Sequence, residues 1–393
     1  MPRPMPLHAP LLAAVTVFAA LTACGGGSAA QGADARVQQA ADNAVRSGLA
    51  GVVLGHLGAS ERLLSAAGVR QVGLPDAVKA SDAFMIGSTT KAMTAALAGR
   101  LVERGAIAWS TTLAEALPDL AAGMRADYRR ITLEQLLAHR GGLLAFNTDA
   151  DFIRFQAYLQ TARAPLPTTL AQRQRFFAAW LLAQEPPPNV TPGETFAYSN
   201  AGYALAALML ESRTGRPYAA LMQQELTLPL GLSVTWTAAD QRVSNGPVGH
   251  AGAQARLSAV PPEDADSAAW LEVLRPAGDG TTVSPDSYAR WVRWHLRALR
   301  GEATPLASSY LQRLQALKAG DYALGWVAGE IDGRPVLFHD GENRGFSTLL
   351  VIDRQGRSAS FGFTNTAADD GSWVIGLLNQ ALLTLQRAQP LAS

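Results

Sequence analysis

Ser88 and Lys91 stand three residues apart in a segment whose apolar spacing predicts a helix from Ser88 to about Arg104. Residues at this spacing share one face of a helix, so the lysine amine can reach the serine hydroxyl. An amine whose pKa is lowered by burial can take the hydroxyl proton and turn the serine into a nucleophile. The spacing alone also fits a structural role, in which Ser88 caps the helix and Lys91 is solvated.

Tyr198 and Asn200 are a second pair of side chains that can do chemistry. A tyrosine beside an ammonium group can lose its proton at neutral pH, serve as a general base and return the proton to a leaving group. Asn200 offers both a donor and an acceptor, which can orient a substrate or Lys91. The structural alternative is that Tyr198 packs in the core and Asn200 caps a helix.

A third segment, His339-Asp340-Gly341, follows a short apolar run that predicts a strand. If the edge of this strand lies beside Ser88, it can give a second backbone N–H group to the oxygen of an attacked carbonyl. Gly341 then allows a substrate to approach the main chain closely. We therefore expect His339 and Gly341 at the same site as Ser88.

The elements that must bring these segments together lie at both ends of the chain. Apolar spacing predicts a helix and two strands near the N-terminus, and an antiparallel meander followed by a helix near the C-terminus. The middle is mostly helical in pattern. The expected fold class is α+β, an α/β sandwich whose antiparallel sheet is built from the N- and C-terminal segments, is flanked by helices and carries an inserted helical subdomain. The expected domain is 34–387, with the sheet region at 34–105 and 263–387 and the subdomain at 106–262; the role of the loop 243–274 stays open.

The first residues of the chain are typical of a targeting segment. An apolar run from Leu11 to Ala23 is shorter than the roughly 20 residues that a bilayer-spanning helix needs. It ends at Cys24, in a sequence that resembles the lipobox of bacterial lipoproteins. We therefore expect a signal peptide at 1–23, a flexible tether at 24–33, and an exported protein on the periplasmic side of the cell envelope, anchored in a membrane by a lipid on Cys24. An ordinary secretory signal is the alternative.

Composition narrows the range of partners. The 33 Lys and Arg residues are balanced by 32 Asp and Glu residues, and no basic run is dense enough to neutralise a row of phosphates, so we expect no nucleic-acid partner. Cys24 is the single cysteine, which rules out an intrachain disulfide and a cysteine-based metal site. No His-Glu-x-x-His or Gly-x-Ser-x-Gly motif occurs. We therefore expect neither a metal nor a cofactor.

Taken together, Ser-x-x-Lys at 88, Tyr-x-Asn at 198 and His-x-Gly at 339 resemble the serine beta-lactamase and penicillin-binding protein superfamily, and within it the class C-like serine hydrolase branch. The similarity covers about residues 34 to 387. It implies that Ser88 is acylated and that Lys91 and Tyr198 share the proton transfers. It also implies that Asn200 contacts substrate and Lys91, and that His339 takes the place of the cation of the third motif. Three further segments are similar to the family: Leu136–Leu143, Pro229–Leu232 and Tyr322–Trp326.

The resemblance further implies an oxyanion hole formed by the backbone N–H groups of Ser88 and Glu342. Two residues depart from the family pattern, because Glu342 is larger and more acidic than the small residue usual there, and Arg140 replaces a small hydroxyl residue. A carboxylate at Glu342 would repel the acid group of a beta-lactam unless Arg344 pairs with it.

The expected activity is that of a serine hydrolase that cleaves an ester or amide through an acyl-enzyme. Small esters and D-amino-acid peptides are the first expectation, and beta-lactam-like substrates the second, since the fold alone does not choose among them. The alternative is a binding or sensor lipoprotein at the cell surface that keeps the penicillin-recognising fold without turning over.

Overall fold

A computed structural model of the chain describes residues 29–58, 60–161, 165–244, 246–254, 256–368 and 372–387. The expected signal peptide and Cys24 lie outside these residues. The described part contains no helix with the length and hydropathy that a membrane crossing requires.

The described residues fold around a seven-stranded sheet in the order β2-β1-β12-β11-β10-β9-β8. All of its neighbouring strands are antiparallel, and Val52 of β1 lies opposite Thr364 of β12, so the two ends of the chain share one sheet. This confirms the sheet predicted from the terminal segments. The strands are β1 (Gly51–Leu57), β2 (Arg62–Gly68), β8 (Tyr322–Ala323), β9 (Trp326–Ile331), β10 (Arg334–Asn343), β11 (Phe346–Asp353) and β12 (Ala359–Thr364).

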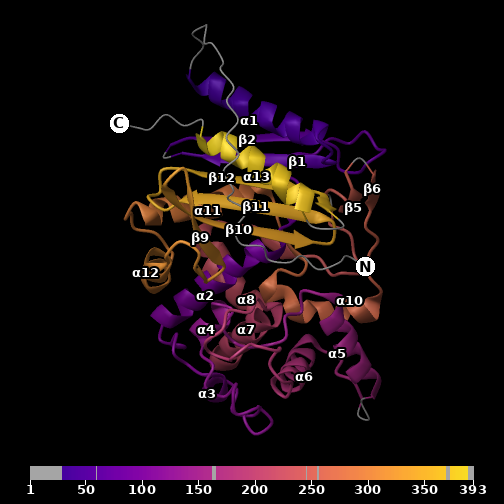
Figure 1. Cartoon of the computed structure of the whole chain (residues 1–393), viewed down its shortest axis with the longest axis vertical. Helices are drawn as coiled ribbons and strands as arrows, with labels where there is room; N and C mark the ends of the chain where they lie inside the picture. The colour runs from indigo at the N-terminus through magenta and orange to yellow at the C-terminus, as the bar shows by residue number, and fades with distance from the viewer. Residues whose placement is uncertain are drawn as a thin grey trace.

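Helices cover both faces of this sheet. Figure 1 shows α1 (Ala29–Arg46) and α13 (Ser372–Arg387) along one side, with the helical region at the opposite end of the molecule. Side chains of β11 alternate between two cores: Leu349 and Val351 pack beneath α1 and α13, while Leu350 and Ile352 face the larger core, which includes residues of α2 (Thr90–Glu103) and α11 (Pro285–Leu299). The strand is buried along its whole length for this reason.

The helical region lies on the side of the sheet opposite α1 and α13 (Figure 1). Thr112, Thr132 and Thr169 each begin a helix with a capping box, in which the threonine side chain and a Glu or Gln three residues later satisfy free backbone N–H groups. The remaining helical elements are η1 (Gly87–Thr89), α3 (Leu113–Ala116), α4 (Leu133–Leu137), α5 (Asp149–Thr161), α6 (Leu170–Leu182), α7 (Asn200–Thr214), α8 (Tyr218–Leu221), η2 (Met222–Thr227), α9 (Leu228–Leu230), α10 (Ala265–Leu271), η3 (Glu272–Ala277) and α12 (Ser308–Ala316).

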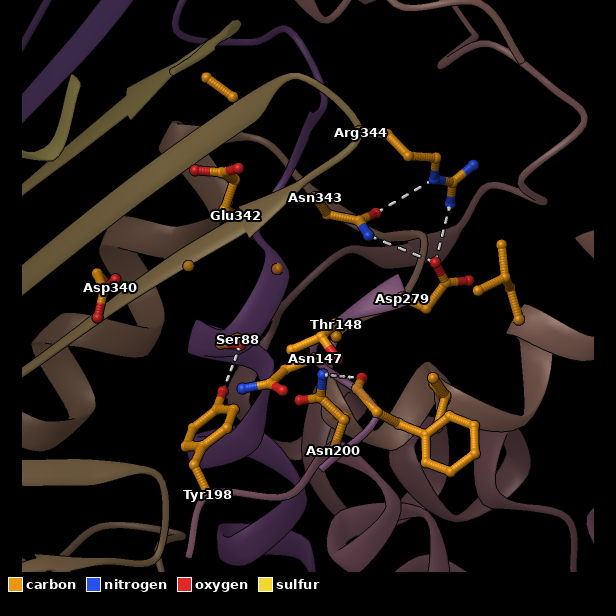
Figure 2. Close-up of a pocket in the computed structure, with 18 of the residues that line it drawn as sticks. Ser88, Asn147, Thr148, Tyr198, Asn200, Asp279, Asp340, Glu342, Asn343 and Arg344 are labelled. Atoms are coloured by element: carbon orange, nitrogen blue, oxygen red, sulfur yellow. Dashed lines mark hydrogen bonds and ion pairs between the residues drawn. The ribbon is translucent and has the colours of Figure 1, made fainter. Parts of the chain in front are cut away.

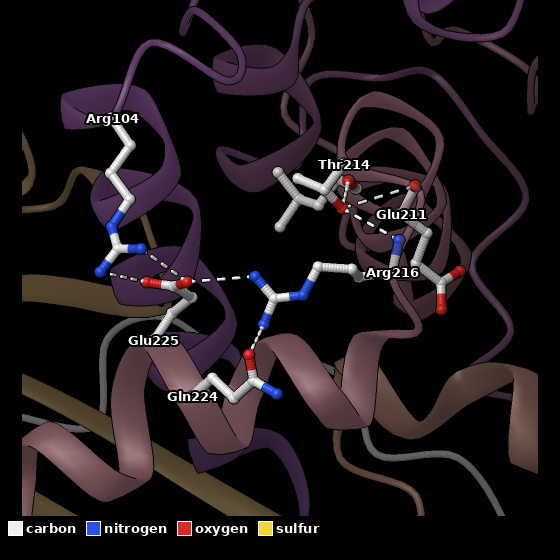
Figure 3. Close-up of polar contacts among 7 residues, drawn as sticks. Arg104, Glu211, Thr214, Arg216, Gln224 and Glu225 are labelled. Carbon is white, nitrogen blue, oxygen red and sulfur yellow. Dashed lines mark hydrogen bonds and ion pairs between the residues drawn. The ribbon is translucent and has the colours of Figure 1, made fainter.

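The buried side chain of Glu225 forms an ion pair with Arg104 at the C-terminal end of α2. Figure 3 shows Glu225 of η2 between the guanidinium groups of Arg104 and Arg216. Glu225 is 3% exposed and lies 2.9 Å from Arg104 Nη2 and 3.3 Å from Arg216 Nη1. Since α2 carries Lys91 in its first turn, this ion-pair network holds the helix that positions the site.

Two expectations about boundaries differ from the structure. Helix α1 begins at Ala29, inside the expected tether 24–33. The expected helical subdomain 106–262 contains short strands that pair with the sheet region. These strands were not predicted, because they are too short to show an alternating pattern. The small sheets are β3-β7-β4 and β13-β5-β6, from β3 (Phe84–Met85), β4 (Val234–Trp236), β5 (His250–Ala253), β6 (Arg256–Ala259), β7 (Thr281–Val283) and β13 (Thr366–Ala368).

Candidate active site

The turn that carries Ser88 lies against β10, backbone to backbone. Gly87 has a φ of +48°, and a Cβ added to it would stand 2.5 Å from the backbone nitrogen of Glu342. A Cβ added to Gly341 would stand 2.3 Å from the Ile86 carbonyl oxygen and 2.8 Å from the Ser88 nitrogen. Only glycine fits at both positions. These contacts place the turn at Gly87 and Ser88 directly against the backbone of Gly341 and Glu342.

The three predicted reactive groups meet at this turn, and Figure 2 shows two of them, Ser88 and Tyr198. Ser88 lies in the 3-10 turn η1 just before α2 rather than inside a helix that begins at Ser88. The Lys91 amine lies 2.9 Å from Ser88 Oγ, and Ser88 Oγ lies 2.7 Å from the Tyr198 hydroxyl. Lys91 Nζ also donates to the Ala277 carbonyl at 2.7 Å. The predicted convergence of an alcohol, an amine and a phenol is thus present.

Burial controls the protonation of this triad. It lowers the pKa of Lys91 well below its ordinary value, against the opposing effect of Asp340. Burial also raises the pKa of Tyr198, and its hydrogen bond to Ser88 only partly offsets this. Burial thus favours the uncharged forms of both the Lys91 amine and the Tyr198 phenol that flank Ser88.

The ring of His139 packs against the ring of Tyr198, a contact that the sequence analysis did not predict. Its ring lies 4.1 Å from the Tyr198 ring and 4.5 Å from the Tyr322 ring, measured between centroids. Nδ1 accepts a hydrogen bond from the Ser199 backbone at 3.1 Å, and burial holds the pKa of His139 well below its usual range. The sequence did offer one indication of this contact, because His139 belongs to the segment Leu136–Leu143, which is similar to the family.

His339 lies in the site as a neutral side chain. Burial lowers its pKa, with Asp340 raising it and Lys91 lowering it to a smaller extent. Nδ1 faces the Asp340 carbonyl, an acceptor, so Nδ1 carries the proton, and Nε2 accepts from the Tyr322 hydroxyl at 3.2 Å. Burial thus disfavours the charged form of His339, the residue expected at the position of the third-motif cation.

Asn200 lies in the cavity but does not make the contact expected with Lys91. Its amide nitrogen donates to the Phe146 carbonyl at 2.8 Å, and among the described residues no hydrogen bond joins Asn200 to Lys91. Its Oδ1 atom is buried without a partner. Figure 2 shows the side chain directed toward the space beside Ser88 and Asn147. Asn200 is therefore placed to accept a hydrogen bond from a substrate.

Arg344 does not pair with Glu342, so the ion pair that would have offset the charge of the Glu342 carboxylate is not formed. Its guanidinium donates to the carbonyls of Thr237 at 2.9 Å and Ala238 at 2.8 Å, and lies 3.7 Å from Asp279 (Figure 2). Burial, with a contribution from Asp340, raises the pKa of Glu342 to about 7. The Glu342 carboxyl group is therefore partly protonated near neutral pH.

A cavity of ≈ 2120 Å³ opens beside the nucleophile, and its lining includes Ser88, Tyr198, Asn200 and His339. Phe155 of α5 and Trp270 of α10 give it an apolar wall, and Trp270 belongs to the loop 243–274 whose role was open. The described residues contain no group of three or more His, Cys, Asp or Glu side chains that could hold a metal ion.

Comparison with known proteins identifies the family. The model of the beta-lactamase family matches residues 33–384. The chain belongs to the beta-lactamase family. This confirms the resemblance, the fold and the class of serine hydrolases inferred from the sequence.

Two curated relatives of this beta-lactamase family member cover most of its length. Penicillin-binding protein 4 of Amycolatopsis lactamdurans is 29% identical over 311 residues, 74% of this chain and 74% of that protein. The D-alanyl-D-alanine-carboxypeptidase/endopeptidase AmpH of Escherichia coli (strain K12) is 24% identical over 332 residues, 80% of this chain and 79% of that protein. The solved structure of a D-stereospecific amidohydrolase from Streptomyces sp. shares the fold, with a TM-score of 0.68, 24% identity and coverage of 89% of this chain and 98% of that one.

Proposed function

We propose that this chain hydrolyses amides or peptides of D-amino acids, or small esters, through an acyl-enzyme on Ser88. The observation that carries the proposal is the unbroken contact from the Lys91 amine through Ser88 Oγ to the Tyr198 hydroxyl. The names of the relatives, a D-alanyl-D-alanine carboxypeptidase and a D-stereospecific amidohydrolase, support this substrate class.

Acylation begins with the neutral amine. Lys91 takes the proton of Ser88 Oγ as the oxygen attacks the substrate carbonyl. The backbone N–H groups of Ser88 and Glu342 stabilise the negative charge on the carbonyl oxygen. Tyr198 then donates its proton to the leaving nitrogen or oxygen, and the bond to the leaving group breaks. The new Lys91 ammonium, with Nζ 4.9 Å from the centroid of the Tyr198 ring, stabilises the phenolate.

Deacylation reverses these transfers. The Tyr198 phenolate takes a proton from water, and the resulting hydroxide attacks the acyl carbonyl. When the bond to Ser88 Oγ breaks, Lys91 returns its proton to that oxygen. The cycle ends with a free acid and with all three groups as they began. Tyr198 is thus a phenolate only after Lys91 has become an ammonium.

The open edge of β10 gives an extended substrate a place to lie. Strand β9 pairs with β10 only as far as Phe338, opposite Val327. The edge from Asp340 to Asn343 is left beside Ser88 without a strand partner on that side. A peptide can align its main chain along this edge, while Asn200 Oδ1 accepts an N–H from across the cavity.

Labelling with a fluorophosphonate tests the proposal. We expect the wild-type protein to gain the mass of the probe on Ser88 and Ser88→Ala to gain none while its circular dichroism stays unchanged. Equal labelling of both proteins would remove Ser88 from the mechanism. A non-turnover sensor gives a single acylation without steady release of product from p-nitrophenyl esters or D-alanyl-D-alanine peptides, so continued release contradicts that alternative.

We also propose that the protein is exported and anchored through Cys24, after cleavage of the signal peptide 1–23. The apolar run before Cys24 supports this. In a bacterial host the wild-type protein should sediment with membranes, whereas Cys24→Ser should appear in the soluble periplasmic fraction. Membrane association of Cys24→Ser would contradict lipidation.

A further inference from the structure

A short segment, 277–281, holds the amine that lies beside Ser88. It begins at the last residue of η3, where the Ala277 carbonyl accepts a hydrogen bond from Lys91 Nζ at 2.7 Å. Lys91 Nζ in turn lies 2.9 Å from Ser88 Oγ, and the lysine is 0% exposed. A shift of Ala277 would therefore move the amine relative to the serine hydroxyl.

The same segment packs against the backbone of the turn that carries the nucleophile. A Cβ added to Gly278 would stand 2.1 Å from the Gly87 carbonyl oxygen and 3.0 Å from the Ser88 nitrogen. The carbonyl of Thr281 accepts a hydrogen bond from the Ile86 backbone at 3.0 Å. The segment thus contacts the chain both before and after Ser88, and its position sets the position of the nucleophile.

Two glycines leave this segment with little rigidity of its own. Gly278 has a φ of +126° and Gly280 a φ of +60°, and Asp279 lies between them. Because glycine is the residue with the most backbone freedom, the segment needs contacts from elsewhere in the chain to keep a single shape.

Those contacts come from the turn between β10 and β11 (Figure 2). Asn343 Oδ1 accepts a hydrogen bond from the Gly280 backbone at 3.1 Å, and Asn343 Nδ2 donates to the Asp279 carboxylate at 3.4 Å. The guanidinium of Arg344 lies 3.7 Å from the same carboxylate. The side chains of Arg344 and Asp279 are only 11% and 10% exposed, so the ion pair is shielded from water.

Arg344 is itself fixed by the chain that follows β4. Its guanidinium donates to the carbonyls of Thr237 at 2.9 Å and Ala238 at 2.8 Å, and the Thr237 N–H donates to the Gly280 carbonyl at 2.8 Å. The φ of Arg344 is +46°, a strained value for a residue with a side chain, which persists only where surrounding contacts hold it. Arg344 thus joins the β10–β11 turn and the chain after β4 to the segment 277–281.

We propose that Arg344 and Asp279 form a buried clamp that positions Ser88 and Lys91 for proton transfer. Within the described residues neither side chain is hydrogen-bonded to the catalytic triad, so both are positioning residues that act through the segment 277–281. The inference rests on the proposed function, since it concerns the geometry of the same site.

The rate of labelling by a fluorophosphonate tests the clamp. Arg344→Met keeps an apolar stem but removes the guanidinium. We expect the rate constant for labelling of Ser88 to fall by roughly 10- to 100-fold, because a misplacement of about 1 Å can cost that much. Labelling should still go to completion in a protein that circular dichroism shows to be folded. Unfolding alone would lower the rate only in proportion to the folded fraction that remains.

A double variant separates positioning from stability. Arg344→Met leaves the Asp279 carboxylate buried without its partner, whereas Arg344→Met with Asp279→Asn removes that charge as well. We expect the double variant to have the higher melting temperature of the two and to keep the slow labelling. Arg344→Lys, which keeps the charge but loses the planar guanidinium, should recover part of the rate. If Arg344→Met does not fold, these two variants carry the same test.

Arg354→Met is the matched control. The guanidinium of Arg354 also donates to backbone carbonyls, those of Leu314, Gln315 and Leu317. Strand β11, with eight residues, separates Arg354 from Arg344, which corresponds to roughly 25 Å. We expect Arg354→Met to lose stability and to be labelled at the wild-type rate.

A wild-type labelling rate in folded Arg344→Met, or equal slowing in Arg354→Met, would overturn the clamp. Recovery of the full rate in the double variant would do the same, because stability alone would then explain the loss. Failure of the wild-type protein to be labelled at Ser88 would instead refute the proposed function, on which the clamp depends.

Discussion

Replacing Tyr198 with phenylalanine removes a single oxygen atom, which lies 2.7 Å from Ser88 Oγ. If that hydroxyl protonates the leaving group and later activates water, its loss should lower kcat/KM by about 10²–10⁴-fold. This corresponds to about 3–5 kcal/mol of transition-state stabilisation. The free energy of unfolding should change by only about 1 kcal/mol, because one buried hydrogen bond is lost and the ring still packs against His139.

Tyr203→Phe is the matched control for this experiment. Tyr203 is also buried, with its ring centroid 5.6 Å from Lys91 Nζ, but its hydroxyl donates to the Leu137 carbonyl at 2.8 Å. We expect a similar loss of stability and at most a several-fold loss of activity.

The assay compares an amide with a p-nitrophenyl ester of the same acid. The amide nitrogen must be protonated to leave, whereas p-nitrophenolate leaves unaided, so Tyr198→Phe should slow acylation by the amide much more than by the ester. Equal losses for both substrates, or equal losses in the Tyr198 and Tyr203 variants, would refute the assignment of Tyr198 as the proton donor.

Three further outcomes follow from the geometry. Gly87→Ala should abolish fluorophosphonate labelling and lower the melting temperature, because the new Cβ would clash with the backbone of Glu342. Gly105→Ala is the control and should keep its activity, because Gly105 also has a positive φ but a Cβ there would have no atom within 4 Å. Burial raises the pKa of Glu342 from 4.5 to about 7, so native protein binds this proton more tightly and the free energy of unfolding falls as pH rises between those values. Glu342→Gln should remove that loss, at most about 3 kcal/mol, in urea unfolding at about pH 5 and about pH 8; identical pH profiles would contradict it. Glu225→Gln should lower the free energy of unfolding by about 1–3 kcal/mol in the same assay, because it removes a buried ion-pair partner of Arg104 and Arg216. Asp332→Asn, whose ion pair is half exposed, should lower it by less than about 1 kcal/mol. Equal losses in the two variants would refute the role given to the buried pair.

The fold was predictable where hydrophobic periodicity reports burial directly. The mostly apolar run of β11, which is buried on both faces, and the helical spacing of α13 predicted those elements correctly. Strands β5 and β6 were not predicted because each spans only four residues; they pair with each other, and β5 also pairs with the distant strand β13. His250, for example, pairs with Thr366.

The site was predictable in its members but not in its electrostatics. Ser88 and Lys91 are joined as their motif indicated, because the i, i+3 spacing is a local feature, and Tyr198 joins them from 110 residues away, as the resemblance to the family implied. The protonation of Tyr198 and His339 was not predictable, because it depends on burial by segments from the whole chain.

The order of assembly follows from the pairing of β1 with β12. Strand β1 pairs at once with β2, but it finds its second neighbour only at Ala359, after nearly the whole polypeptide has been made. Pairings over such distances form slowly and late. The turn around Ser88 packs against β10, so a chain cut short before residue 334 would contain the nucleophile but lack the N–H group of Glu342 in the proposed oxyanion hole. Under the proposed mechanism we therefore expect hydrolysis to begin only once the last strands have joined the first.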